Sequence, residues 1–101
     1  MKLSIVYDNT SLRPDLKADW GFSCFIEYKN YNILFDTGSK GRILLANAHK
    51  LGISLSTADI VFISHSHSDH MGGLPAVLKE NHKARIYLTI TNKEVTIGGR
   101  F

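Results

Sequence analysis

A four-residue apolar run, Ile60-Val61-Phe62-Ile63, leads through Ser64 into the polar segment His65-Ser66-His67-Ser68-Asp69-His70. A short continuous apolar run is typical of a strand buried on both faces, as in the parallel part of an α/β sheet. Ligand sites in such sheets lie at the carboxyl ends of the strands, which is where this polar segment begins. The sequence therefore predicts an α/β sheet with a functional loop directly after a buried strand.

The remaining sequence supplies the other strands and helices of such a sheet. Residues 3–7, 22–28 and 31–35 have the composition of strands, and Lys29-Asn30 between the last two is typical of a tight hairpin. From residue 40 the apolar spacing becomes helical, and Gly52 is placed to end that helix.

A second helical pattern covers residues 74–81, and strands are expected over 84–90 and 94–97. Strands that alternate with helices predict an α/β fold, a β-sheet with flanking helices.

The composition predicts one globular domain. Hydrophobic residues make up 44% of the 101 residues and charged residues 21%, which is ordinary for a globular protein. The net charge of +3 comes from cations that form no run along the chain. We therefore expect no nucleic-acid partner.

No stretch approaches the ~20 apolar residues of a membrane span, and Asp8 comes too early for a signal peptide. Cys24, the single cysteine, is expected to be a small buried side chain. We therefore predict a cytoplasmic protein without membrane contact.

The histidine segment has the spacing of metal ligands. In an extended segment residues two apart project to the same side, so His65 and His67 can direct their imidazoles at one ion about 2 Å from each nitrogen. If the chain turns after them, Asp69 and His70 can face a second ion about 3.5–4 Å away, an arrangement that serves hydrolysis. The Gly72-Gly73 pair lets the backbone pass close to whatever the loop binds. A metal site is favoured over an inert surface loop.

These residues resemble the metal-binding signature of the metallo-β-lactamase superfamily. The resemblance comprises His65-x-His67-x-Asp69-His70 with the strand before it, Gly72-Gly73 after it, and residues 33–38, which are similar to the strand and turn that precede the site in the family. It runs from about residue 7 to residue 88. Within the superfamily, the spacing and sequence of the motif are most similar to the branch that includes a methanopterin-biosynthesis transferase and many uncharacterised metal-dependent hydrolases.

The resemblance implies a dinuclear site, usually of Zn²⁺ and in some members of iron or manganese. His65 and His67 would bind the first ion, and Asp69 and His70 the second. Asp36 would support the loop from behind, as carboxylates behind metal-binding histidines do. In the complete enzyme a metal-bound hydroxide, oriented by Asp69 as the catalytic residue, would attack an ester, lactam or phosphoester of a small-molecule substrate.

The resemblance also implies that this chain corresponds to the first half of the family's αββα sandwich. The family packs two similar halves sheet to sheet and completes its metal sites with a histidine, an aspartate and a final histidine from later in the chain. Here the only histidine after His70 is His82, and the only acidic residues after Asp69 are Glu80 and Glu94. The inner sheet face should then be apolar and exposed, and we predict a homo-oligomer formed through that face with twofold symmetry.

Two alternatives to a hydrolase remain at this point. One is a non-catalytic half-domain that binds metal weakly or not at all and self-associates. The other is a homodimeric aspartic protease in which Asp36-Thr37-Gly38 supplies one aspartate per chain, although that leaves the helical patterns and the histidines unexplained. Outside the site, His49 and His82 are expected at helix ends, where the helix dipole favours them, and Trp20 is expected to close one edge of the core.

Overall fold

The fold is one β-sheet of parallel and antiparallel strands with helices packed against it. The computed structural model describes residues 1–11, 13–65, 67–90 and 93–97. The elements in chain order are β1 (Lys2–Tyr7), β2 (Ser23–Tyr28), β3 (Tyr31–Phe35), α1 (Gly41–Lys50), the 3₁₀ turn η1 (Leu55–Thr57), β4 (Ile60–Ile63), α2 (Ser68–Met71), α3 (Leu74–Glu80), β5 (Arg85–Ile90) and β6 (Lys93–Ile97).

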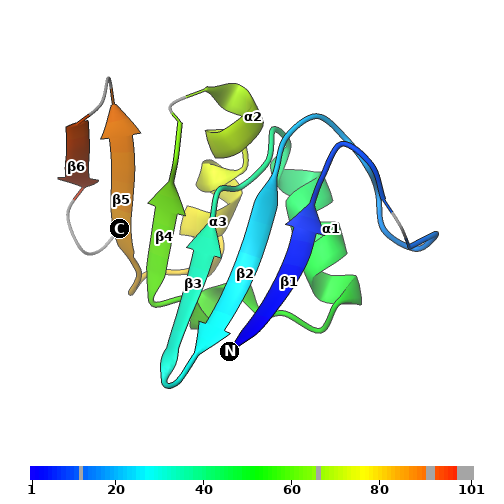
Figure 1. The fold of residues 1–101 in the computed structure, drawn as a ribbon, viewed down its shortest axis with the longest axis horizontal. Helices are drawn as coiled ribbons and strands as arrows, with labels where there is room; N and C mark the ends of the chain where they lie inside the picture. Colours follow the sequence, from blue (N-terminus) through cyan, green and yellow to red (C-terminus); the bar gives the residue numbers. More distant parts are fainter. Residues whose placement is uncertain (12, 66, 91–92, 98–101) are drawn as a thin grey trace.

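The six strands lie in the order of the sequence, from β1 at one edge to β6 at the other (Figure 1). β3, β4 and β5 are parallel, whereas β1, β2 and β6 each run antiparallel to a neighbour. The α/β sheet with flanking helices is therefore confirmed. β3 and β4 are parallel neighbours, with Phe35 beside Phe62. The segments that follow these two strands therefore leave the sheet at the same end, the carboxyl end of both strands.

The helices α1 and α3 lie together on one face of the sheet (Figure 1). Gly52, with a φ of 72°, ends α1 as expected: its amide donates to His49 and that of Ile53 donates to Ala48, which satisfies two of the last helical carbonyls. The core between helices and sheet is formed by apolar side chains that are almost fully buried, among them Phe25, Leu34, Leu44, Val61, Ile63, Val77 and Ile86.

The opposite sheet face is largely apolar, and none of the helices in the described residues covers it (Figure 1). Strand pairing places two rows of side chains across β1 to β5, one of Leu3, Ile26, Ile33, Ile60 and Arg85 and one of Ile5, Cys24, Phe35, Phe62 and Tyr87. We call these two rows the open face. The expectation that β4 is buried on both faces is wrong, because Val61 and Ile63 are fully buried while Ile60 and Phe62 are only half-buried on the open face.

Other individual predictions have mixed outcomes. Cys24 is buried, and this burial raises the pKa of its thiol. His49 lies in the last turn of α1, and His82 follows the end of α3. Trp20 does not close the core: 58% of it is exposed, because it lies in the loop before β2 and not in a strand. Among the described residues no helix is both long enough and apolar enough to cross a membrane.

Candidate metal centre

The site begins with Asp36, the residue directly after β3. Its backbone has a φ of 58°, a left-handed conformation that aspartate adopts more readily than most residues. Its amide donates to the carbonyl of Phe62 at 2.8 Å, which fastens it to β4, and its side chain is fully buried. A carboxylate is thereby placed beneath the loop that follows β4.

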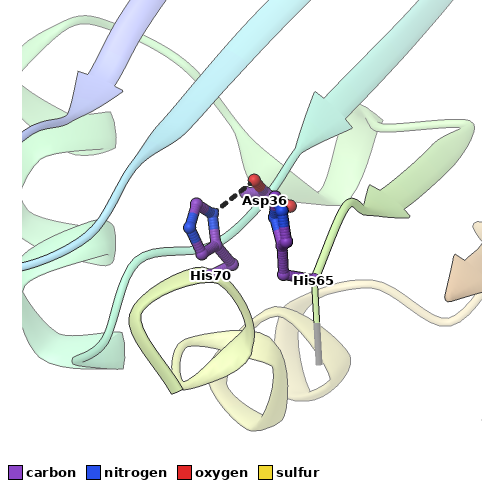
Figure 2. Close-up of side chains that lie close together, drawn as sticks. All are labelled: Asp36, His65 and His70. Carbon is purple, nitrogen blue, oxygen red and sulfur yellow. Dashed lines mark hydrogen bonds and ion pairs between the residues drawn. The ribbon is translucent and has the colours of Figure 1, made fainter. Parts of the chain in front are cut away.

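Three hydrogen bonds converge on the Asp36 carboxylate. The backbone amide of Ser64 donates to Oδ1 at 2.7 Å, and the hydroxyl of Ser64 donates to Oδ2 at 2.6 Å. His70 Nδ1 lies 2.7 Å from Oδ2 (Figure 2). Since an ionised carboxylate only accepts, His70 must carry a proton on Nδ1. A buried charge with this many donors is stabilised where it lies.

The turn after Asp36 holds the end of the histidine loop. The amide and the hydroxyl of Thr37 both donate to the carbonyl of His70, at 2.7 and 3.0 Å. The amide of Gly73 donates to Gly38 at 3.0 Å and to the Thr37 hydroxyl at 3.1 Å. A Cβ on Gly73 would overlap the Thr37 carbonyl oxygen, so glycine is required for this close approach.

The loop before β2 contacts the site from another side. The amide of Phe22 donates to the carbonyl of Asp69 at 3.2 Å, and Gly21, at a φ of 127°, leaves no room for a Cβ beside that same carbonyl. Nearby, the amide of Trp20 and the side chain of Lys40 hold the pKa of Asp19 below its usual range. Two segments far apart in sequence, the loop before β2 and the turn after β3, therefore hold the backbone of α2.

Asp69 and His70 present two acceptors to one point. His70 Nε2 lies 3.3 Å from Asp69 Oδ2, and with Nδ1 donating to Asp36 the lone pair of Nε2 faces that oxygen. Two acceptors at this separation require a cation between them, either a proton or a metal ion. Ligands at the corners of a tetrahedron around zinc, with bonds of about 2.0–2.1 Å, are separated by about 3.3–3.4 Å. The pair fits a metal ion, and so does Asp69 Oδ1, a buried oxygen without a hydrogen-bond partner in the described part of the loop.

The remaining histidines lie around this pair. The rings of His65 and His70 are 4.7 Å apart, and Asp36, His65 and His70 each offer a ligand atom within 4.8 Å of the others (Figure 2). The ring of His67 lies 6.2 Å from that of His65 and nearly parallel to it. Of the predicted site residues, the structure brings His65 and His70 together over Asp36, with Asp69 against His70 and His67 at the margin.

Asp36 is better suited to support ligands than to be one. Both of its oxygens already accept hydrogen bonds within the chain, from Ser64 and His70. The same bonds leave the aspartic protease alternative without support, because that dyad needs a carboxylate free to face its copy. Ser64 was missed by the sequence reasoning. The available signal was a hydroxyl side chain placed between the end of a buried strand and the first histidine of the loop.

Comparisons with known proteins agree with this fold. Residues 21–94 match the model of the metallo-beta-lactamase superfamily. The chain is 37% identical over 67 residues to a 7,8-dihydropterin-6-methyl-4-(beta-D-ribofuranosyl)-aminobenzene-5'-phosphate synthase of Methanocaldococcus jannaschii, covering 62% of this chain and 23% of the relative. It is also 37% identical over 79 residues to the endoribonuclease YSH1 of Gibberella zeae, covering 74% of this chain and 10% of that protein. The chain thus spans less than a quarter of the length of these relatives.

Solved structures extend the likeness. A metal-dependent hydrolase of the beta-lactamase superfamily superposes with a TM-score of 0.63 at 33% identity, over 83% of this chain and 28% of the other. The short form of human tRNase Z shares the fold with a TM-score of 0.60 at 22% identity, over 77% of this chain and 28% of the other. The expectation of no nucleic-acid partner is at odds with relatives that are named as RNA-processing enzymes. By its match over residues 21–94, the chain belongs to the metallo-β-lactamase superfamily.

Proposed function

We propose that this chain carries the metal loop of a metal-dependent hydrolase. The observation that carries the proposal is the Asp69–His70 pair, in which Nε2 and Oδ2 face each other at 3.3 Å over a buried, fully hydrogen-bonded Asp36. A proton on Nε2 would make this pair an ordinary ion pair, but it would leave the buried Asp69 Oδ1 without a partner among the described residues, and a metal ion would supply one.

The proposed ligands are those predicted from the sequence. His65 and His67 hold one ion and Asp69 and His70 hold the other, with Asp36 orienting the His70 ring from behind. Zinc suits this set of imidazole and carboxylate donors, and iron or manganese are the alternatives. When bound, such an ion acidifies water and polarises the oxygen of a carbonyl or phosphoryl group. Asp69 is the proposed catalytic residue because its carboxylate would lie beside water held by such an ion.

Among ester, lactam and phosphoester substrates, the relatives favour the phosphoester. Two proteins that are 37% identical to this chain are named as an endoribonuclease and as ribonuclease Z. The proposed reaction is hydrolysis of a phosphodiester, with an RNA substrate replacing the small molecule that the sequence alone suggested.

Zinc binding by the metal-free chain tests the proposal. We expect the chain to take up zinc in competition with a chromophoric chelator, and both Asp69→Asn and His67→Ala to weaken uptake about tenfold or more. His49→Ala is the matched control, because His49 is an exposed histidine on α1. Equal zinc uptake by all four proteins would contradict the assigned ligands. Turnover of bis(p-nitrophenyl) phosphate by the zinc-loaded chain supports the hydrolase, whereas zinc binding without turnover supports the non-catalytic half-domain.

We further propose that the open face binds a second copy of this chain. The two rows cover five neighbouring strands about 4.8 Å apart, so the open face is a continuous and largely apolar surface. A twofold sheet-on-sheet dimer would pack these rows against their copies and remove them from water. Arg85 is the one charged residue in the two rows and lies at one end of its row, so a twofold arrangement can keep both copies of it at the rim.

A further inference from the structure

Ser64 joins the buried carboxylate to the first histidine of the loop. Its hydroxyl oxygen lies 2.6 Å from Asp36 Oδ2 and 2.9 Å from His65 Nδ1. We propose that Ser64 is a positioning residue that holds the ring proton of His65 on Nδ1, so that the lone pair of Nε2 is presented to a metal ion. The inference rests on the proposed function for its purpose, but not for its test.

The direction of the hydrogen bonds follows from counting protons. A serine hydroxyl has one proton to donate and can accept further bonds. The carboxylate of Asp36 cannot donate, so the Ser64 proton points at Asp36. The contact between Ser64 and His65 is then a hydrogen bond only if His65 Nδ1 carries a proton and donates it to the Ser64 oxygen. In a neutral imidazole, a proton on Nδ1 leaves Nε2 as the ligand atom.

Ser64 is itself held in place at two points. Its backbone amide donates to Asp36 Oδ1 at 2.7 Å and its hydroxyl donates to Oδ2, so both oxygens of the carboxylate accept a hydrogen bond from Ser64. Ser64 lies between the end of β4 and His65, so this double contact fixes the hydroxyl relative to both. The serine therefore connects the buried carboxylate to His65 through hydrogen bonds.

Asp36 consequently sets the ring protons of two histidines by different routes. It accepts directly from Nδ1 of His70 at 2.7 Å and through Ser64 from Nδ1 of His65. Both Nε2 atoms are then free to bind, and the two rings are 4.7 Å apart (Figure 2). His65 is exposed, so without Ser64 water could satisfy either of its nitrogens and neither tautomer would be imposed.

The tautomer can be measured directly in the metal-free chain. Long-range ¹H–¹⁵N correlation spectra of the imidazole rings, recorded at about pH 8.5, where imidazole is ordinarily neutral, report which ring nitrogen carries the proton. We expect His65 in the unsubstituted chain to be protonated on Nδ1, and Ser64→Ala to shift it towards the Nε2-protonated form. Ser64→Thr keeps the hydroxyl and should retain the original tautomer. His65→Gln identifies the signals by removing them.

His70 provides an internal control for folding. Its Nδ1 donates to Asp36 without Ser64, so its tautomer should be unchanged in Ser64→Ala if the site remains folded. An unaltered His65 tautomer in Ser64→Ala with His70 intact, or an Nε2-protonated His65 in the unsubstituted chain, would overturn the proposal. If Ser64→Ala disturbs His70 as well, the unsubstituted and Ser64→Thr spectra still decide it.

Zinc affinity gives a second reading. We expect Ser64→Ala to weaken zinc binding about 10–100-fold, the range seen when residues behind a metal ligand are removed, and Ser64→Thr to restore most of it. A chain that binds no zinc would count against the proposed function alone, because the tautomer of His65 is read without metal.

Discussion

Single residues at the site combine unusual backbone positions with close backbone contacts. Asp36 at a φ of 58° turns the chain out of β3 while its amide still bonds to β4. Opposite it, Gly73 approaches the Thr37 carbonyl so closely that hydrogen is the only side chain that fits. The histidine loop can therefore lie this close to the turn after β3 only because Gly73 has no Cβ.

Gly73→Ala should displace the loop and lower stability. Its Cβ would overlap the carbonyl oxygen of Thr37, part of a turn that is fixed by several backbone hydrogen bonds, so we expect a loss of about 2–3 kcal/mol of unfolding free energy in chemical denaturation. Gly52→Ala is the control, because it adds a methyl group at a positive φ into open space and should cost only about 1 kcal/mol. Equal losses in both variants would show that the contact with Thr37 is unimportant.

At the scale of elements, Asp59 aligns the start of three parallel strands. Its amide donates to the Asn32 carbonyl and its Oδ2 accepts from the Asn32 amide, which ties it to β3. Its carbonyl accepts from the amide of Arg85 at the start of β5, and its Oδ1 pairs with Lys83 at 3.3 Å. The Asn32 amide, helped by Lys83, lowers the pKa of Asp59 below its ordinary value of 3.8.

This lowered pKa predicts a pH-dependent contribution to stability. The folded state holds the proton of Asp59 less tightly than the unfolded chain, so the stabilisation is present above about pH 4 and is lost as the pH falls through the folded pKa. Asp59→Asn should lower the melting temperature near about pH 7 and have almost no effect near about pH 2.5. Melting curves of both proteins across this range, with Asp8→Asn as a charge-matched control, measure it. A difference that does not depend on pH would show that the carboxylate charge is not responsible.

At the scale of the whole molecule, the two faces of the sheet differ in what packs against them. One face packs against α1 and α3, whereas no helix of the described residues covers the open face, whose two rows are apolar apart from Arg85. Phe35 and Phe62 stack at 5.5 Å near its centre, and Ile5 remains 42% exposed at its margin. An apolar surface of this extent favours association. The single-domain organisation and the cytoplasmic location remain predictions from the sequence.

Phe62→Lys tests the proposed dimer. Removing two phenyl groups from a twofold interface, each worth about 1.5–3 kcal/mol on burial, should raise the dimer dissociation constant roughly 100-fold or more. The protomer should stay folded because Phe62 is only half-buried within it. Trp20→Lys is the control, because it changes an exposed aromatic outside the sheet. Sedimentation equilibrium measures both variants. A monomeric unsubstituted chain at high concentration, or equal weakening by both substitutions, would refute the interface.

The sequence by itself determined the elements and the family. Strand and helix periodicities are local properties, so the hairpin, the helix ended by Gly52 and the strand 60–63 could be predicted closely. The histidine loop is contiguous in the chain, and its residue types and spacing were enough to indicate metal chemistry and the superfamily.

Only the tertiary structure decided how these residues act together. Parallel pairing of β3 with β4 places Asp36 beneath Ser64 and His70, residues 28 and 34 positions further along the chain. No local pattern reports such a contact, which is why the role of Ser64 was missed. Burial also depends on the neighbouring layer, so Trp20 was wrongly placed in the core and β4 was wrongly expected to be covered on both faces. Periodicity reports which residues share a face, but the presence of a layer packed against that face is a property of the assembled fold.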